Sequence, residues 1–381
     1  MSINHLFACV DKHRDQIIAT YLTLHGIPEP AWQEYQTSKY VRERLKNAGY
    51  HVMESKLGTE VVAHAKAPVS PLVGLRADLD CLIHVIDGSE QYIHSCGHDA
   101  HTTMVLCAGE LIAQEAPEMA QHVKLIFQPA EEVGEGARKL IEAGAADDLS
   151  YLAGIHLRPN NEIGYGLAAA SVRHAASLTL TYEIVGKGAH TGRPHLGDNA
   201  ADGLMMAAAA VNAIKLDPLS CATVNVVSMR TGAASPNIIP DHAQLVVNAR
   251  LGTNELVEEA RLRIDRAVEQ GTLAVGTTSR LVHSKVLPAA EPSSEMVKIG
   301  EKAIVSVLGE KGLVPTICSS GSEDFHFFSQ LSNLKTTFFG LGANLVPGLH
   351  CPDMSFDLEA LIHGVKILIA FVWYTVEEYG C

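Results

Sequence analysis

Residues 94–101 read His-Ser-Cys-Gly-His-Asp-Ala-His, and no other stretch of this length in the chain holds as many potential metal ligands and catalytic groups. Cys96 and His98 flank a glycine, which lets the backbone turn tightly enough for a thiolate and an imidazole to converge on one point. Residues 102–114 are almost wholly apolar, which predicts a buried helix directly after this loop. We therefore expect the loop to stand on rigid structure and to form the centre of an active site.

Asp99 and His101 lie one step outside this pair. A carboxylate beside a ligating imidazole usually fixes the tautomer of the ring and raises its basicity, which is a supporting role. Two alternatives stay open for the octapeptide taken alone. It could be a surface loop that happens to hold histidines, since the chain has 19 of them, or Cys96 could act as a nucleophile beside His98.

The composition limits the classes of protein to which the chain can belong. At 381 residues it is too long for one ordinary compact core, so two domains are expected. Lys plus Arg number 29 against 43 Asp plus Glu, a formal net charge of -14, which argues against nucleic acid or an anionic membrane as a partner. A small-molecule ligand remains compatible with this composition.

Signals for export or membrane insertion are not evident in the sequence. Residues 1–16 lack an apolar core long enough for a signal peptide, and no stretch of about 18 uncharged apolar residues predicts a membrane span. The eight cysteines, at positions 9, 81, 96, 107, 221, 318, 351 and 381, form no CxxC pair and no disulfide framework. We expect mostly free thiols in a reducing compartment, and hence a cytoplasmic location.

Upstream of the octapeptide, the hydrophobic pattern predicts two helices and then three strands. They span, in order, residues 3 to about 24, 34 to about 48, 51–55, 60–66 and 71–80. The third strand ends in charge, with Arg76 and Asp78 replacing the preceding apolar run. Open α/β sheets place their sites at the carboxyl ends of such strands, although an Arg–Asp pair that merely caps a strand would look the same.

A further buried strand is predicted over 122–128, and Pro129 ends it before Glu131 and Glu132. Adjacent side chains on a regular strand point to opposite faces, so the two carboxylates share a site only if they lie in the turn after the proline. Paired carboxylates suit a division of labour in which one binds metal and the other handles protons. The open alternative is a pair of solvated acids at the start of a helix.

From about residue 177 the pattern changes to a β-α-β-β-α-β order, which is that of a ferredoxin-like α+β insert. The expected strands are 177–186, 221–230, 242–251 and 279–285, and the expected helices are 199–214 and 255–270. We therefore expect an α/β catalytic domain made of residues 1–176 and 287–381, interrupted by a lid or dimerisation domain over 177–286.

Five possible metal ligands come from four separate loops. His156 ends a predicted strand over 151–159, and His350 lies in a Gly/Pro loop before a final helix over 358–378. With Glu131 left over as a free carboxylate, the set is too large for one tetrahedral structural zinc. It fits two metal ions that share one ligand, for which Cys96 is the expected bridge, and that together acidify a water and polarise a substrate carbonyl. The five residues are Cys96, His98, Glu132, His156 and His350.

These residues stand in motifs that resemble a known family, the dinuclear metal-dependent amidohydrolases and exopeptidases of hippurate hydrolase, auxin-conjugate hydrolase, aminoacylase and carboxypeptidase G. The resemblance runs nearly end to end, and so many motifs in the right order are highly specific. The motifs are HGIPEP at 25–30, GLRADLD at 74–80, SCGHDAH at 95–101, FQPAEEVGEGA at 127–137, GIHLRP at 154–159, GKGAHTGRPHLGDNA at 186–200, PNIIPDHAQLVVNAR at 236–250, GSEDF at 321–325, and GLH before FDLEAL near the end.

The resemblance implies a zinc-exopeptidase-like catalytic domain split by a lid, with the same five residues as ligands of two divalent metal ions. It implies that Glu131 is the general base and that Asp78 supports a ligand from behind. His190 matches a lid histidine that helps to hold the substrate carbonyl or its oxyanion. Asn237 and Arg250 match lid positions that bind the carboxylate side of the substrate.

The chain also departs from the usual family pattern. Residues 79–84 read LDCLIH where relatives usually read MDALP, which could reshape the pocket wall, and SCGHDAH replaces the commoner ACGHDGH. Arg76 stands where more distant relatives carry a ligating histidine, a role that His98 is expected to take. Arg158 places a cation near a ligand, where it could pair with a substrate carboxylate or cap a helix.

The expected reaction is hydrolysis of the amide bond of an N-acyl amino acid by metal-activated water, with Glu131 accepting and returning the proton. A dipeptidase or carboxypeptidase on the same site and a non-catalytic binding protein on the same fold are the alternatives. A cysteine ligand favours zinc, while the glutamate and histidine ligands also suit manganese or cobalt. We expect a small-molecule substrate, no nucleic-acid or membrane partner, and a homodimer through the lid as one option for assembly.

Overall fold

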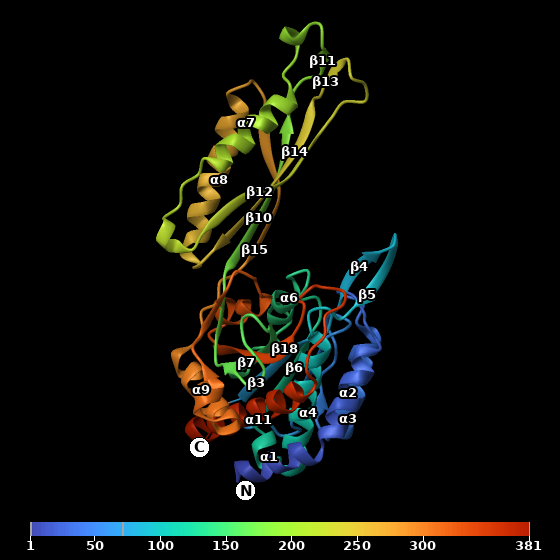
Figure 1. Ribbon diagram of the computed structural model, residues 1–381, viewed down its shortest axis with the longest axis vertical. Coiled ribbons are helices and arrows are strands. Elements are labelled where there is room, and N and C mark those ends of the chain that lie inside the picture. The colour runs from blue at the N-terminus through green and yellow to red at the C-terminus, as the bar shows by residue number, and fades with distance from the viewer. Residues whose placement is uncertain (1, 71, 381) are drawn as a thin grey trace. The chain divides into compact units, whose positions relative to one another are not determined.

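The computed structural model describes residues 2–70 and 72–380, and the chain divides into two compact units (Figure 1). Unit 1 comprises Met1–Arg173, Glu291–Cys318 and Glu323–Cys381, and unit 2 comprises His174–Ala290 and Ser319–Ser322. Cys381, one of the cysteines expected to be free, lies outside the described residues. Each unit has a hydrophobic core of its own.

Unit 1 is built on an eight-stranded sheet with the order β1-β2-β6-β3-β7-β18-β8-β16. Its central strands β6, β3, β7 and β18 run parallel, and β6 and β3 are buried along their whole length, as expected for parallel strands covered on both faces. The strands are β1 His51–Val52, β2 Val61–His64, β3 Leu72–Asp78, β6 Val123–Gln128, β7 Leu149–Pro159, β8 Ala168–Ala169, β16 Leu313–Val314 and β18 Lys335–Leu345.

Helices pack against this sheet and against one another, with α11 in contact with both α4 and α9. Among the described residues α11 is long and apolar enough to cross a membrane, but 67% of its most apolar window is buried inside the protein, so it serves as a core helix. The helices are α1 Ile3–Lys12, α2 Arg14–His25, α3 Tyr35–Asn47, α4 His98–Glu115, α5 Pro117–Ala120, α6 Gly136–Glu142, α9 Ser294–Leu308, α10 Phe327–Leu331 and α11 Glu359–Tyr379.

Short elements complete the chain. The 3-10 turns are η1 Pro194–Leu196, η2 Pro218–Ser220, η3 Glu310–Gly312 and η4 Asp324–His326. Three two-stranded ribbons stand outside the larger sheets: β4 with β5, β9 with β17 and β11 with β13. Their bounds are β4 Leu82–Ile86, β5 Ser89–Ile93, β9 Val172–His174, β17 Ile317–Ser319, β11 Ala189–His190 and β13 Ile238–Ile239.

The sequence prediction for unit 1 needs two corrections. The single helix expected from residue 3 to about 24 is two helices, because the backbone of His13 leaves helical geometry and its Nδ1 atom lies 2.8 Å from the Cys9 carbonyl oxygen. The β4–β5 hairpin is absent from the prediction. Its turn consists of Asp87 and Gly88, both with positive φ, and an Asp-Gly pair between β-forming residues is the signal that could have revealed it.

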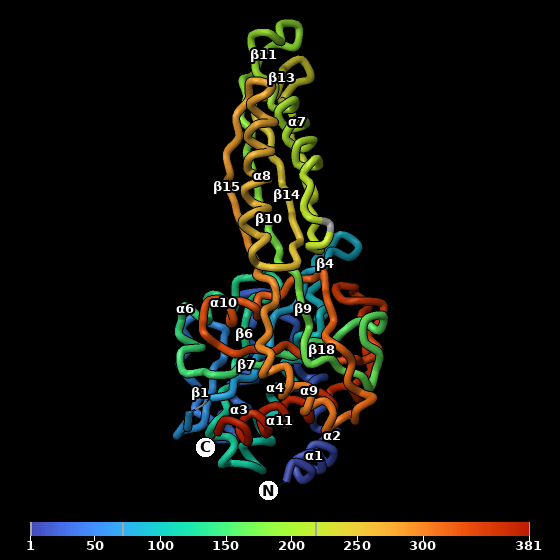
Figure 2. Tube along the Cα trace, turned by 90° about the vertical axis from the view of Figure 1, so that its left-hand side faces the viewer, coloured from blue at the N-terminus to red at the C-terminus, as the bar shows by residue number. Residues whose placement is uncertain are grey.

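Unit 2 is a four-stranded antiparallel sheet in the order β12-β14-β10-β15, with helices α7 and α8 packed against each other and the sheet (Figure 2). Buried residues alternate along β10 and β14, the pattern of a sheet with one covered face. The chain order β-α-β-β-α-β confirms the predicted ferredoxin-like insert. The elements are β10 Ala176–Val185, α7 Ala200–Asn212, β12 Thr223–Thr231, β14 His242–Leu251, α8 Glu255–Leu273 and β15 Thr278–Leu287.

Candidate metal centre

The predicted ligands of unit 1 meet at the carboxyl ends of neighbouring parallel strands. This is the edge at which open α/β sheets bind ligands, because the loops that leave the strands converge there. The contributing residues are His156 near the end of β7, Glu131 and Glu132 after β6, His350 after β18, and Cys96 and His98 at the start of α4.

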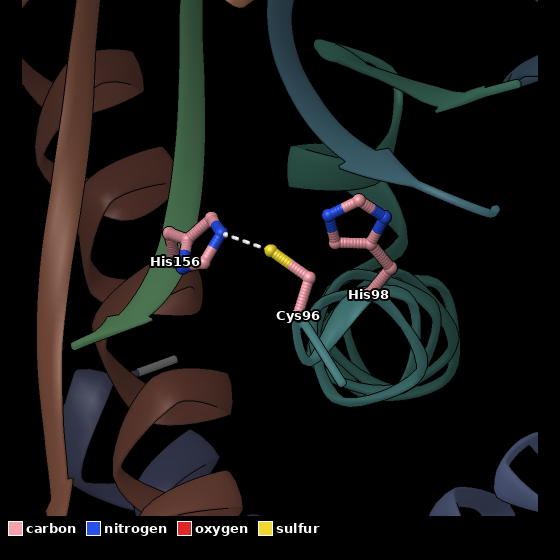
Figure 3. Close-up of side chains that lie close together, drawn as sticks. All are labelled: Cys96, His98 and His156. Atoms are coloured by element: carbon pink, nitrogen blue, oxygen red, sulfur yellow. Dashed lines mark hydrogen bonds between the residues drawn. The ribbon is translucent and has the colours of Figure 1, made fainter. Parts of the chain in front are cut away.

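A glycine makes the turn between Cys96 and His98 possible, as the sequence predicted. Gly97 has a φ of +88°, in the left-handed region that favours glycine, and it directly precedes α4. A Cβ atom at this position would also crowd the Leu157 Cδ1 atom at 3.3 Å. Figure 3 shows the result: the Cys96 sulfur lies between the rings of His98 and His156.

The five predicted ligands fall into two sets that share Cys96. Ligand atoms of Cys96, His98 and His156 lie within 4.8 Å of one another, and so do those of Cys96, Glu132 and His350. The Cys96 Sγ atom is 3.5 Å from His156 Nε2 (Figure 3). A thiolate common to both sets is placed to bridge two cations.

Two buried polar atoms in this cluster have no hydrogen-bond partner. They are His98 Nε2 and Glu132 Oε1, which lie 3.7 Å apart. Leaving a buried polar atom unpaired costs about 1–3 kcal/mol, so such atoms point to a partner that the chain does not itself supply. Burial and the nearby Glu132 carboxylate also raise the pKa of the Cys96 thiol well above its usual range. Divalent cations held by the two ligand sets would satisfy these atoms and stabilise the thiolate, so the donor set fits metal.

Main-chain carbonyl oxygens contact the Nδ1 atoms of the two buried histidines, His98 and His156. His98 Nδ1 lies 2.9 Å from the Asp80 carbonyl oxygen, and His156 Nδ1 lies 2.6 Å from the Leu157 carbonyl oxygen. A ring that donates from Nδ1 presents an unprotonated Nε2, which is the form that binds metal. Burial lowers the pKa of His156 well below its ordinary value, which keeps that ring neutral.

Asp80 is a supporting residue that the sequence reasoning missed. Its carboxylate accepts hydrogen bonds from the backbone N–H groups of Glu131 at 3.1 Å and Glu132 at 3.0 Å. Its carbonyl also accepts from His98, so Asp80 joins the turn after β6 to the start of α4. The charged end of β3 indicated a site here, but it did not tell which of its two aspartates faces the ligands.

Asp78 lies beside the ligands and contacts His101 and Arg76. Its Oδ1 atom accepts from His101 Nδ1 at 2.8 Å, and its Oδ2 atom accepts from Arg76 at 2.7 Å. His101 in turn accepts the Leu157 N–H at its Nε2 atom, so both ring nitrogens are engaged within unit 1. The Asp80 carbonyl supports the ligand His98, and Asp78 Oδ2 lies 3.8 Å from His98 Nε2, so the role expected of Asp78 stays a prediction.

Glu131 stands beside the ligands with one oxygen directed at them. Its Oε2 atom is 3.9 Å from His98 Nε2, and its Oε1 atom lies 3.5 Å from the Asp324 N–H nitrogen. The residue is 9% exposed, and burial raises its pKa well above the ordinary value, with further contributions from Glu323 and Glu132. A carboxylate with a raised pKa, next to ligand atoms, suits proton transfer.

The turn that contains Glu131 and Glu132 is held by the carboxylate of Glu34, a second supporting residue that the sequence analysis did not identify. Ala130 has a φ of +58°, a conformation that alanine rarely adopts. Its N–H donates to Glu34 Oε1 at 2.9 Å, and the Thr59 hydroxyl donates to Glu34 Oε2 at 2.8 Å. Glu34 is fully buried, and burial raises its pKa to about 7. Because 96 positions separate Glu34 from Ala130, local sequence patterns carry no sign of the contact.

Arg158 has a partner inside unit 1. The residue is 3% exposed, and its Nε atom donates to Glu162 Oε2 at 2.8 Å. Its expected contact with a substrate carboxylate stays a prediction to which this geometry adds no support.

His190 and Asn237 lie close together in unit 2. His190 belongs to β11, which pairs with β13, and Asn237 directly precedes β13. The Gly192 N–H donates to His190 Nδ1 at 3.0 Å. A neutral His190 ring therefore carries its proton at Nε2, where it can donate to a ligand.

Arg250 lies apart from this pair within unit 2. It stands near the end of β14 that is remote from β13, opposite Ser177, and donates to Ser322 Oγ at 2.6 Å. From His242 to Arg250 the strand advances eight residues, which is about 26 Å at about 3.3 Å each. Among the three lid residues, the structure brings His190 and Asn237 together and leaves Arg250 at the other end of the sheet.

His84 and Ser95, two residues at which this chain departs from the usual family pattern, contact each other. The His84 Nε2 atom is 2.8 Å from Ser95 Oγ. The Ser95 carbonyl also accepts the N–H of His350 at 2.7 Å. The pair therefore connects hairpin β4–β5 to the loop before Cys96, and Ser95 connects that loop to His350.

Comparison with known proteins gives relatives over most of the chain. A model described as peptidase family M20/M25/M40 matches residues 74–374. The hippurate hydrolase of Campylobacter jejuni is 30% identical over 335 residues, which cover 83% of this chain and 85% of that protein. An IAA-amino acid hydrolase of Arabidopsis thaliana is 28% identical over 370 residues, covering 93% and 84%. An N-acetylcysteine deacetylase of Bacillus subtilis is 29% identical over 356 residues, covering 89% and 91%.

Solved structures share the fold. A Bacillus subtilis protein described as a dinuclear metal binding peptidase from the M20 family gives a TM-score of 0.79 at 24% identity, covering 96% of this chain and 99% of that one. A putative aminohydrolase from methicillin-resistant Staphylococcus aureus gives a TM-score of 0.86 at 22% identity, covering 97% and 98%. The predicted α/β fold with an inserted lid domain is thereby confirmed. Because the family model spans most of its length, the chain belongs to peptidase family M20/M25/M40 and is a hydrolase of that family.

Proposed function

We propose that this hydrolase cleaves the amide bond of an N-acyl amino acid, with Glu131 as the general base. The observation that supports this most directly is the pair of ligand sets that share Cys96, beside a buried Glu131 that lies 3.9 Å from His98 Nε2. The relatives named hippurate hydrolase and N-acetylcysteine deacetylase carry names that refer to acylated amino acids. At identities of 30% or less, these names support the class of substrate and leave the particular acyl group open.

The proposal assigns one divalent ion to Cys96, His98 and His156 and a second to Cys96, Glu132 and His350. When bound, such ions polarise a substrate carbonyl and make a water more acidic. The cysteine favours zinc, and manganese or cobalt also suits the remaining ligands. Asp80 holds the main chain of both glutamates, so Glu132 can bind while Glu131 stays free.

Glu131 handles the proton in this proposal. Its Oε2 atom is the carboxylate oxygen directed at the ligands, so it takes the proton from the attacking water. Glu131 Oε1 lies 3.5 Å from the Asp324 N–H nitrogen, which holds the side chain in place while its Oε2 atom carries that proton until the tetrahedral intermediate collapses. The same oxygen then returns the proton to the leaving amine, which departs as the free amino group.

We extend the proposal to three residues of unit 2. Because Gly192 fixes the tautomer, His190 presents an Nε2–H that can donate to the oxyanion of the intermediate. Asn237 offers a side-chain amide close to His190 for the carboxylate side of the substrate. Arg250 offers a guanidinium for the same group, but it lies about 26 Å along the sheet from that pair, so a small substrate held by Arg250 cannot also contact His190 and Asn237 of the same chain. Its bond to Ser322 gives Arg250 a defined position on β14.

A homodimer through unit 2 is part of the proposal. Strand β12 is an edge of the four-stranded sheet, and it exposes Val227 and Met229. Helix α7, which contacts β12, exposes Met205 and Met206. An unpaired edge strand beside exposed apolar side chains is a surface that a second copy can cover. Multi-angle light scattering on the purified protein measures the mass that decides this point.

The decisive experiment combines elemental analysis with an amine-release assay on N-acetyl amino acids, N-benzoyl amino acids and dipeptides. We expect about two metal ions per chain in the proposed centre, with hydrolysis of N-acyl amino acids that chelation removes and one added metal restores. Faster release from dipeptides than from every acylated amino acid would favour the peptidase alternative. Absence of turnover on all amides would favour a binding protein.

The same assay separates metal-assisted hydrolysis from a thiol mechanism. If Cys96 were the nucleophile, chelation would leave the rate unchanged and alkylation of Cys96 would abolish it. In the proposed mechanism chelation itself stops the reaction, and bound metal protects Cys96 from alkylation.

A further inference from the structure

A second cluster of metal-ligating side chains lies in unit 1, outside the centre described above. His5 and Cys9 are four residues apart on α1 and therefore share one face of that helix. Glu115 is the last residue of α4, which packs against α1. The ligand atoms of these three residues lie within 4.8 Å of one another. Because α4 spans 18 residues and begins at His98, its two ends are about 26 Å apart, so this triad is a separate site.

The distances within the triad are those of a tetrahedral zinc site. His5 Nε2 is 3.2 Å from Glu115 Oε2, and Cys9 Sγ is 3.6 Å from His5 Nε2. With Zn–S of about 2.3 Å and Zn–N and Zn–O of about 2.0 Å, tetrahedral angles give N···O and S···N separations of about 3.3 Å and about 3.5 Å. The corresponding sulfur–nitrogen separation in the buried centre, from Cys96 to His156, is 3.5 Å.

The arrangement excludes a catalytic relay of cysteine, histidine and glutamate. A relay requires the acid at one ring nitrogen and the nucleophile at the other. Here both contacts go to the same atom, His5 Nε2. Three ligand atoms that converge on one point suit a cation placed between them, because one cation can bind an imidazole, a thiolate and a carboxylate together.

The charge and exposure of the cluster are consistent with a cation. The Glu115 carboxylate supplies negative charge to the site, and its Oε2 atom lies 3.2 Å from His5 Nε2. The His5 side chain is 52% exposed, and that of Glu115 is 22% exposed, which leaves room for a water as fourth ligand. An open site with three protein ligands differs from a closed structural zinc, which uses four.

We propose that His5, Cys9 and Glu115 bind one zinc ion, with water in the fourth position. Zinc suits this set because it accepts thiolate, imidazole and carboxylate ligands together. On binding, the Cys9 thiol releases its proton to solvent and the sulfur binds as the thiolate. The ion connects α1 to the end of α4, so it stabilises the packing of the first helix of the described chain. It is independent of the proposed hydrolytic reaction.

Zinc titration of the metal-free protein, followed by desalting and elemental analysis, tests the proposal. Wild type is expected to retain about three zinc ions per chain, and the Cys9→Ser and His5→Ala variants about two, with unchanged amide hydrolysis. The control is Cys221→Ser, because Cys221 is an exposed free cysteine outside the triad and its loss should leave the count at about three. If the buried centre failed to bind instead, wild type would retain about one ion, and Cys9→Ser would remove it.

Alkylation of Cys9 by iodoacetamide, measured by peptide mass spectrometry, gives a readout independent of metal counting. Zinc should slow the modification of Cys9 by about tenfold or more, because the coordinated thiolate is no longer a free nucleophile. Cys221 in the same digest should react at the same rate with and without zinc. Equal rates at Cys9 in both conditions, or equal zinc counts for wild type and Cys9→Ser, would overturn the proposal.

Discussion

The metal centre of unit 1 and the β11–β13 ribbon of unit 2 hold their polar groups in opposite ways. In unit 1, His98 is 1% exposed and bonds to Asp80, which in turn holds the turn after β6. In unit 2, His190 is exposed, and the bond to its ring comes from Gly192, only two residues away. One site is fixed by contacts between distant segments, and the other by its own turn.

The polar groups of the two sites are therefore held in position by different kinds of contact. A buried polar network is stable only when nearly all its members have partners, so removing one disturbs the rest. A residue on an exposed ribbon can be replaced without leaving a buried group unpaired. We therefore expect substitutions of the ligands and of their buried supports, such as Asp80, to change metal content and stability together with rate, with Glu131, which holds no metal in the proposal, as the exception. Substitutions on the ribbon should change rate alone.

The largest expected effect comes from Glu131→Gln. Glutamine keeps the size of the side chain but cannot accept the proton, so kcat should fall roughly 10³- to 10⁴-fold while metal content stays at the wild-type value. Steady-state amine release and elemental analysis on the same preparation measure both. Glu132→Gln is the matched control, because it removes a proposed ligand and should lower metal content as well as rate. A Glu131→Gln protein with most of its rate would disprove the assignment of the base.

His190→Ala should have the next largest effect. Loss of one oxyanion donor typically costs about 10²- to 10³-fold in kcat. Because His190 is exposed, the melting temperature and metal content should match wild type. His190→Gln should recover part of the rate, since the glutamine amide also donates. Equal rates for all three proteins would remove His190 from the mechanism and leave the ribbon without a catalytic role.

Asp80→Asn tests the network in unit 1. The asparagine amide nitrogen would lie next to the backbone N–H of Glu131 or Glu132. Two hydrogen-bond donors would then face each other with no acceptor. Loss of such a supporting partner typically costs about 10- to 100-fold in metal affinity or activity. Competition with a chelator measures the affinity. Asp15→Asn is the control, since that side chain is 96% exposed. Wild-type affinity in Asp80→Asn would mean that the carboxylate does not organise the turn.

The same contrast explains what the sequence could reveal. Cys96, His156 and His350 follow or interrupt apolar segments in local motifs, so pattern alone predicted where they would lie. Gly97 was predictable for the same reason, because its turn involves only its neighbours. The regular order of strands and helices in unit 2 was likewise local information.

The residues that support the ligands lie far from them in the sequence, so sequence patterns did not identify them. Asp80 and Glu34 act on residues 51 and 96 positions away, which no periodicity encodes. From the sequence, Asp78 was named as the support of a ligand, and Asp80, whose carbonyl contacts His98, was not. Asp78 ends β3 and Asp80 follows two residues later, so the two carboxylates look alike in the sequence, and only packing decides which one reaches the turn.

The smallest effect is expected for the contact between His25 and Asp99, at the edge of the metal centre, where side chains become exposed to solvent. His25 Nδ1 lies 2.6 Å from Asp99 Oδ2, with the Asp99 side chain buried and that of His25 47% exposed. The hydrogen bond to Asp99 raises the pKa of His25 above its ordinary 6.5. A base with a raised folded-state pKa contributes stability that is complete below its unfolded pKa and is lost as the pH rises through the folded value.

The His25→Gln variant measures this contribution. The difference in free energy of unfolding between wild type and variant, from urea denaturation of the metal-free protein, should be largest near about pH 5.5 and should shrink towards about pH 9. It should stay below about 1 kcal/mol, because solvent screens a half-exposed pair. A difference that grew with pH would show that His25 is neutral when paired. In that case, the difference in solvent exposure would not explain why this contact is weaker than the buried network around His98.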